Sequence, residues 1–159
     1  MNITLGNRTA ETVRIYYEKS QNPKIRKVLP QEPKTIEEVL EDYTRTLLPD
    51  ARSYGKIILA DGNYIGDIWC YGIDMNEEPN AMLSYCIFEE DYWGQGIGTE
   101  AAALFLKEIN DRYNFKTIGA FTFADNIASI RVLEKNQFVL LEEFEEDGRA
   151  SQFFLLTRS

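Results

Sequence analysis

The sequence predicts an α/β fold of the α+β type, with a mixed, largely antiparallel central sheet and helices on both of its faces. Strand-like segments dominate the middle and the C-terminal part of the chain, and segments with helical periodicity lie before and between them. The 159 residues are 44% apolar, which is enough for one sizeable hydrophobic core, and they contain no internal repeat or long linker. We therefore expect residues 1–159 to form a single domain.

The first part of the chain predicts a short strand followed by a helix. Ile3–Leu5 is the strand, and Thr9–Ser20 is a helix because its apolar residues recur at helical spacing. Asn22 and Pro23 break that pattern, and we expect a loop through Pro30 and Pro33 to follow.

A capping signal marks the start of the second helix. Thr35 is a suitable N-cap, and Glu38, three residues later, completes a capping box. One face of this helix is apolar and consists of Ile36, Val39, Leu40, Tyr43 and Leu47. The other side carries the acidic residues Glu37, Glu38, Glu41 and Asp42, which we expect to be solvated. Pro49 ends the helix.

The remaining elements follow from apolar runs and turn residues. The predicted strands are Lys56–Ala60, Tyr64–Ile73, Ala81–Phe88, Lys116–Phe123, Phe138–Phe144 and Gln152–Thr157. The predicted helices are Ile97–Tyr113 and Asn126–Asn136. An apolar stripe along the first of these predicts packing against the sheet, and it consists of Ile97, Ala101, Leu104, Phe105, Ile109 and Tyr113. The complete order is β-α-α-β-β-β-α-β-α-β-β.

A glycine-rich segment, residues 92–100, joins the strand Ala81–Phe88 to the helix that follows. Gly94, Gly96 and Gly98 let the main chain approach a ligand and adopt positive φ without a Cβ penalty. Free N–H groups at a helix start suit a phosphate or pyrophosphate. The spacing fits neither the dinucleotide fingerprint nor a P-loop. The segment is therefore either a main-chain phosphate cradle or a turn that merely connects two elements.

Two motifs favour the cradle. Residues 92–101 resemble motif A of the GNAT acyl-CoA N-acyltransferase superfamily, Arg/Gln-x-x-Gly-x-Gly/Ala, with Trp93 at the Arg/Gln position before Gly96 and Gly98. Residues 126–138 resemble motif B of the branch that contains the ribosomal-protein N-terminal acetyltransferases, with Gln137 in place of the glycine before Phe138. The resemblance covers residues from about 55 to the C-terminus well.

The resemblance implies a GNAT fold, whose fourth and fifth strands splay apart, and acetyl-CoA as cosubstrate. It places the pyrophosphate on the cradle, which consists of Gly94, Gln95, Gly96, Ile97, Gly98 and Thr99. Main-chain groups near Ile87 and Phe88 would bind the pantetheine arm, and one N–H there would polarise the thioester carbonyl. Asn126 would lie near the same arm, and it is also a suitable N-cap for the next helix.

The catalytic residues are less clearly marked. Many GNAT members protonate the departing thiolate with a tyrosine, whose position here holds Leu133. The ribosomal branch has a serine at the position of Ser129, so Ser129 is either the residue beside the sulfur or a helix-start hydrogen-bonding residue. Asp67, Trp69 and Tyr71 alternate on one strand face and either line the acceptor cleft or form an ordinary sheet face. The sequence offers no clear general base, since Glu89, Glu90 and Asp91 are expected on the surface.

Composition excludes several kinds of chemistry. Histidine is absent, so no Ser-His-Asp or Cys-His nucleophile is possible, and with only two cysteines a typical zinc site is not expected. The net charge of −9 argues against nucleic acid and is compatible with solubility or with steering of a cationic substrate. We expect no metal, no membrane span, a cytoplasmic location and reduced thiols at Cys70 and Cys86.

The expected function is an N-acetyltransferase that moves an acetyl group from acetyl-CoA to a primary amine by direct attack in a ternary complex. The acceptor is a protein N-terminus, an aminoglycoside-like drug or a small polyamine, and the protein is a monomer or a homodimer. Cys86 as an acyl carrier is an alternative to direct attack. An acyl-CoA-binding regulatory domain without turnover and a structural module that does not bind CoA are the alternatives to an enzyme.

Overall fold

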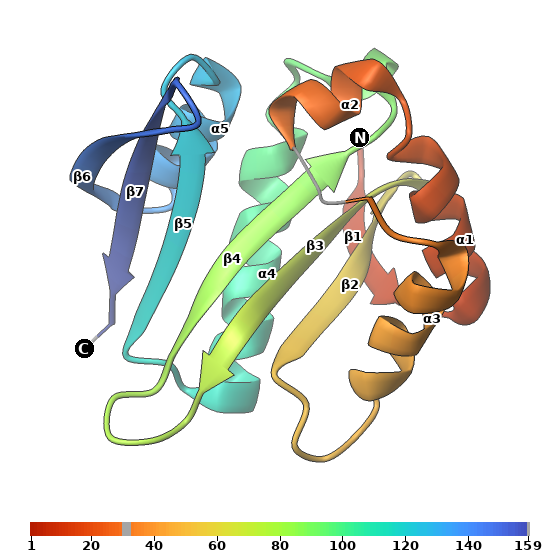
Figure 1. Ribbon diagram of the computed structural model, residues 1–159, viewed down its shortest axis with the longest axis horizontal. Helices are drawn as coiled ribbons and strands as arrows, with labels where there is room; N and C mark the ends of the chain where they lie inside the picture. Colours follow the sequence, from red (N-terminus) through yellow and green to blue (C-terminus); the bar gives the residue numbers. More distant parts are fainter. Residues whose placement is uncertain (30–32, 159) are drawn as a thin grey trace.

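The computed structural model describes residues 1–29 and 33–158, and Figure 1 shows its seven-stranded sheet. The strands are β1 (Ile3–Asn7), β2 (Ser53–Ala60), β3 (Asn63–Asp74), β4 (Asn80–Ile87), β5 (Thr117–Phe123), β6 (Val139–Glu146) and β7 (Arg149–Thr157). Their spatial order is β1-β2-β3-β4-β5-β7-β6. Of the neighbouring strands in this order, β4 and β5 run parallel, and the others run antiparallel. The expected mixed, largely antiparallel sheet is confirmed.

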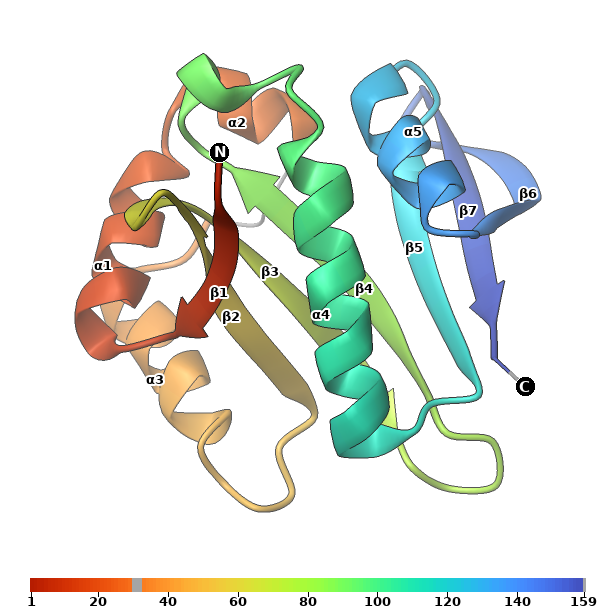
Figure 2. The same ribbon diagram turned by 180° about the vertical axis from the view of Figure 1, so that it is seen from behind.

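Helices cover both faces of this sheet (Figures 1 and 2). They are α1 (Ala10–Lys19), α2 (Pro23–Val28), α3 (Ile36–Arg45), α4 (Ile97–Tyr113) and α5 (Ile127–Lys135), and a short 3₁₀ helix, η1, spans Glu90–Tyr92. The main core lies between the sheet and α4, where Phe105 and Ile109 are fully buried. A smaller cluster of Ile25, Cys86 and Phe88 lies on the opposite face, under α1 and α2. The expected stripe on α4 is confirmed except for Leu104, which is exposed.

The helix α2 was not predicted. Asn22 and Pro23 were expected to interrupt the chain, but Asn22 caps α2 by accepting a hydrogen bond from the Lys24 N–H at 3.0 Å. Proline is well tolerated at the first position of a helix, because its missing N–H has no partner there and its φ is already helical. The pair is therefore a start signal rather than a break.

The predicted start of α3 is confirmed and its predicted end is wrong. Thr35 accepts a hydrogen bond from the Glu38 N–H at 3.2 Å, and the Glu38 carboxylate accepts from the Thr35 N–H at 3.0 Å. The helix ends at Arg45, so Leu47 lies beyond it and is exposed rather than part of the apolar face. Pro30, which belongs to the predicted preceding loop, lies outside the described residues.

The splay between β4 and β5 is present. The two strands pair only over Asn80–Met82 and Thr117–Gly119 and then separate. Antiparallel strands direct alternate main-chain groups toward each neighbour. Because the Phe88 N–H donates to the Ile65 carbonyl oxygen at 2.9 Å, the main-chain groups of Phe88 face β3, and those of Ile87 and Tyr85 face the opening.

Candidate active site

The cradle, residues 94–99, is formed by glycines that have two different functions. Gly94 and Gly96 adopt φ values of 74° and 78°, in the left-handed region that favours glycine. A Cβ at either position would meet no described atom within 4 Å, so the space above them is open. Gly98 was expected to share this role but lies inside α4 without positive φ. A Cβ there would approach Val132 Cγ2 to 3.1 Å and Tyr85 Cε2 to 3.2 Å, so Gly98 permits close packing.

The N–H groups of the cradle are available to a ligand. The flanking donors are used, since the Trp93 N–H donates to the Glu90 carbonyl and the Glu100 N–H to the Gly96 carbonyl. Between them, the six N–H groups from Gly94 to Thr99 have no hydrogen-bond acceptor among residues 1–29 and 33–158. They lie at the positive end of the 17-residue helix α4. This arrangement is suited to a phosphate or pyrophosphate.

Two basic residues that the sequence reasoning did not select lie beside the cradle. Arg131 and Lys135 line a cavity of about 330 Å³ together with Tyr85, Asn126, Ser129 and the cradle residues other than Gln95; we call it the cradle cavity. The Gln95 side chain instead donates to the Asp91 carbonyl oxygen at 2.7 Å. The two basic residues are one helical turn apart on α5, and the described lining of this cavity includes no carboxylate. Their i, i+4 spacing, which places both on one face of the helix in the second motif, was the available sequence signal.

Trp93 connects the cradle to the end of β4. Its indole Nε1–H donates to the carbonyl oxygen of Ile87 at 2.8 Å. This hydrogen bond uses the carbonyl of Ile87 and leaves its outward-facing N–H for another partner. Of the two residues expected to offer main-chain groups here, Ile87 faces the opening, and the N–H of Phe88 is used within the sheet.

Ser129 lies where β4 and α5 approach each other. Its Oγ is 3.1 Å from the hydroxyl oxygen of Tyr85, and its N–H donates to Asn126 Oδ1 at 3.2 Å. Asn126 is thus the N-cap of α5 and also lines the cradle cavity. Burial raises the pKa of Tyr85 above its usual value, so its hydroxyl stays protonated at neutral pH. Tyr85 is a functional candidate that the sequence reasoning missed, because a strand tyrosine carries no motif.

A smaller central cavity of about 200 Å³ adjoins the cradle cavity. Both are lined by Tyr85, Asn126 and Ser129, and Leu133 faces only the central one. The carboxylate in its described lining is that of Glu146, at the end of β6. Glu146 was not among the candidates from the sequence, because the β6–β7 hairpin is far from the motifs along the chain.

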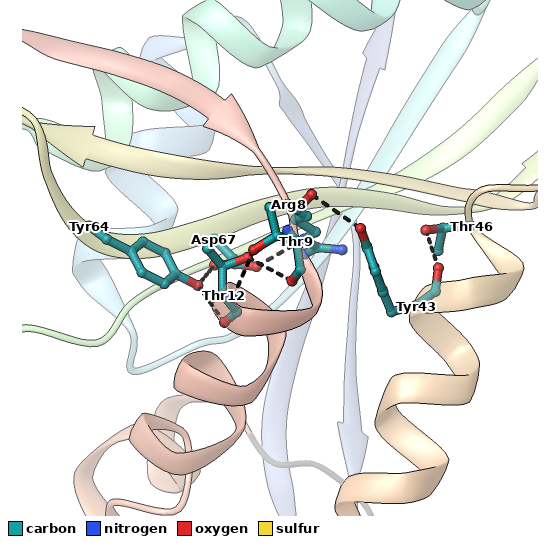
Figure 3. A network of polar contacts seen from close by, with 7 residues as sticks. All are labelled: Arg8, Thr9, Thr12, Tyr43, Thr46, Tyr64 and Asp67. Carbon is teal, nitrogen blue, oxygen red and sulfur yellow. Dashed lines mark hydrogen bonds and ion pairs between the residues drawn. The ribbon is translucent and has the colours of Figure 1, made fainter.

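On the α1–α3 face lies a cleft of about 760 Å³, which we call the Trp69 cleft. The three residues expected on one strand face, Asp67, Trp69 and Tyr71, all line it. Asp67 is 2% exposed and lies in the polar network of Figure 3, where the Arg8 Nε–H donates to its carboxylate at 2.9 Å and the Tyr64 hydroxyl donates to its other oxygen. Asp67 therefore stabilises the wall of the cleft and is not free to bind an ammonium.

The three cavities are adjacent and share lining residues. Tyr71 and Ser84 line both the Trp69 cleft and the central cavity, and Leu29, at the end of α2, lines all three. In Figure 1, α2 lies over the C-terminal end of β4, next to the place where β4 and β5 diverge. The central cavity, which contains Ser129 and Tyr85, thus adjoins both the cradle cavity and the Trp69 cleft.

Both cysteines are free and buried, on opposite faces of the sheet. Burial raises the pKa of the Cys86 thiol to about 12, and that of the Cys70 thiol likewise to about 12. At neutral pH both are thiols rather than thiolates, which makes them poor nucleophiles.

The splayed β4 and β5 and the free main-chain cradle at the start of α4 are the two features that the resemblance to acyl-CoA-dependent acyltransferases implies. The family profile described as "Acetyltransferase (GNAT) domain" matches residues 4–139. The chain belongs to the GNAT acetyltransferase family, so the resemblance found in the two motifs is confirmed. No curated protein matches the chain.

Solved structures show the same fold at low sequence identity. Spermidine N-acetyltransferase from Vibrio cholerae, in complex with CoA and spermine, has a TM-score of 0.84 and 18% identity, covering 98% of this chain and 95% of that one. The aminoglycoside acetyltransferase AAC(6')-Ib, in complex with coenzyme A, has a TM-score of 0.79 and 20% identity, covering 99% and 95%. RimJ of Mycobacterium smegmatis, in complex with CoA-disulfide, has a TM-score of 0.83 and 17% identity, covering 98% of this chain and 81% of that one.

In the described part of this chain, no helix has the length and apolar character needed to cross a membrane.

Proposed function

We propose that this protein transfers an acetyl group from acetyl-CoA to a primary amine by direct attack in a ternary complex. The observation that carries the proposal is the set of six free N–H groups at the start of α4, beneath open space at Gly94 and Gly96. Each hydrogen bond from such a donor to a charged phosphate contributes about 1.5–3 kcal/mol, which exceeds the helix dipole contribution of about 0.3–1 kcal/mol. Several donors together are sufficient to hold a pyrophosphate.

The other contacts of acetyl-CoA follow from the same geometry. Arg131 and Lys135 are placed to pair with its phosphates. Outward-facing main-chain groups of Tyr85 and Ile87 are suited to bind the pantetheine arm in the manner of an added strand. The N–H of Ile87, which the sheet and Trp93 leave free, is our candidate for polarising the thioester carbonyl.

The chemistry uses few side chains. The amine nitrogen forms a bond to the thioester carbon, the carbon–sulfur bond breaks, and the bonding electron pair leaves with the sulfur. Ser129 donates its hydroxyl proton to that sulfur and takes up the proton of the Tyr85 hydroxyl 3.1 Å away, and Tyr85 regains a proton from solvent water. The proton lost by the amine passes to Glu146 or to solvent water in the central cavity.

Direct attack is favoured over a cysteine-bound acyl group. Cys86 lines the cradle cavity, but it is buried in the cluster that it forms with Ile25 and Phe88. Its thiol has a pKa near 12, so its thiolate form is scarce at neutral pH.

The two buried, free thiols also support our proposal of a cytoplasmic, reducing location.

The second candidate function is an acyl-CoA-binding domain without turnover. It is favoured by Leu133, which is 4% exposed and occupies the position where many GNAT members have a tyrosine. The deciding experiment measures release of the CoA thiol from acetyl-CoA in the presence of a panel of amines. Release that depends on an amine supports the transferase, whereas CoA binding without such release supports the regulatory domain.

A further inference from the structure

The Trp69 cleft has a charge that differs from that of the whole chain. The chain carries a net charge of −9, which taken alone is compatible with polycationic acceptors. The described residues that line this cleft carry three cationic and two anionic side chains, namely Arg8, Arg26, Lys34, Asp42 and Asp67. Their sum is +1, so the negative charge of the chain is not concentrated on the described part of this lining.

Both carboxylates of this lining are already paired. Asp67 is bound to Arg8 at 2.9 Å, and Asp42 to Lys34 at 2.7 Å and to Arg45 at 2.7 Å. The Lys34 ammonium holds the pKa of Asp42 below its usual value, so this carboxylate is charged and neutralised by its partners. Neither carboxylate is free to bind the amines of a polycation.

Arg26 is the lining cation without a carboxylate partner among the described residues. Its Nη1–H donates to the neutral Gln21 Oε1 at 2.8 Å, and its side chain is partly buried at the edge of the cleft. An arginine whose other N–H donors are available binds carboxylates with favourable geometry. It is therefore placed to pair with a negative group on the acceptor.

The reacting amine meets a different environment from the rest of the acceptor. The described lining of the central cavity, which contains Ser129 and Tyr85, includes one carboxylate, that of Glu146, and no cation. No described cation there lowers the pKa of the ammonium, so an amine whose ordinary pKa is low is favoured. An α-amino group, near 8, needs little deprotonation at neutral pH, whereas a lysine-like amine near 10.4 is protonated in all but about one molecule in a few thousand.

We propose that the acceptor is the α-amino group of a peptide with negative charge close to its N-terminus, and that Arg26 binds this negative charge. This inference rests on the proposed acetyl transfer and selects one acceptor class for it. Spermidine-like and aminoglycoside-like polycations are poor acceptors for this chain, in contrast to what its net charge suggests.

The test compares acceptors in the CoA-release assay. Two tetrapeptides share a free N-terminal serine and a C-terminal leucine amide, one with two aspartates between them and the other with two lysines; spermidine is the third acceptor. We expect kcat/KM for the aspartate peptide to exceed that for the other two by about tenfold, mainly through KM, and the ratio to shrink as salt is added. Arg26→Gln should remove most of this preference, and Arg26→Lys should retain part of it.

Lys24→Gln is the matched control. Lys24 is a cation on the same helix as Arg26, but it pairs with Glu90 and does not line the cleft. The control should keep the preference of the unaltered protein. Turnover that favours the lysine peptide or spermidine overturns the acceptor class and leaves the transferase intact. A preference that survives Arg26→Gln overturns the role of Arg26. Absence of turnover with all three acceptors, while CoA still raises the melting temperature, overturns acetyl transfer as well.

Discussion

Replacing Gly96 with valine tests the phosphate cradle most directly. Gly96 has a φ of 78°, and a non-glycine residue in this region costs about 1–2 kcal/mol, somewhat more when it is β-branched. Nothing lies within 4 Å of the new Cβ, so no packing clash adds to this cost. Against a typical stability of about 5–15 kcal/mol, the variant should remain folded.

Binding of CoA should suffer much more than folding. The branched side chain occupies the open space above the free N–H groups, where the pyrophosphate is expected. Loss of one or two hydrogen bonds to a charged group, at about 1.5–3 kcal/mol each, corresponds to a dissociation constant raised by about 10- to 10⁴-fold. Isothermal titration calorimetry with CoA measures this change, and a thermal melt without ligand measures the stability of the variant.

Gly62→Val provides the control for backbone strain. Gly62 lies in the turn between β2 and β3, has a φ of 83°, and likewise has no atom within 4 Å of the place that a Cβ would occupy. It should lose similar stability and bind CoA normally. If folded Gly96→Val binds CoA as tightly as the unaltered protein, the cradle does not bind the diphosphate and our reasoning is refuted.

Three further outcomes follow from the site and the fold. Tyr85→Phe should lower kcat by about tenfold or more with CoA affinity retained, since general acid catalysis typically contributes about 10²–10⁴-fold; an unchanged kcat would remove Tyr85 from the proton path. Cys86→Ala should keep turnover. The free energy of unfolding should also fall less between about pH 9 and pH 12 in this variant than in the unaltered protein. That fall arises because the unfolded thiol ionises near 9 and the folded one near 12, so stability is lost as pH rises; denaturant melts across this range test it. Gln137→Gly should raise the unfolding free energy by about 1 kcal/mol in urea melts, because Gln137 has a φ of 72°, and a loss of stability would contradict this.

The elements with a strong periodic pattern were predictable from the sequence. The α3 capping box, the apolar stripe of α4 and the alternating strands each depend on local chemistry, and the two motifs identified the family. The helix α2 was missed because Pro23 is both a helix breaker and a favoured first helical residue, and only the capping by Asn22 distinguishes the two. Missing α2 meant missing Arg26 and Leu29 as residues of the site.

The arrangement within the site was less predictable, because it depends on contacts between distant segments. Tyr85 reaches Ser129 across 44 residues, and Arg8 reaches Asp67 across 59. Periodicity placed Asp67 on the correct strand face, but it does not show that this carboxylate is paired. The charge of the chain was also a poor guide, because a sum over 159 residues does not say where the charges lie.

In the proposed reaction, the two substrates enter from opposite faces of the sheet, on either side of the opening between β4 and β5. The cradle cavity is lined by α4 and α5, and the Trp69 cleft by α1 and α3 on the other side of the sheet. An acceptor peptide of the kind proposed above would therefore not have to pass the coenzyme, and its acetylated product could depart while the spent coenzyme is still in place. Initial-rate kinetics should accordingly give intersecting lines, and neither substrate should be obliged to arrive first.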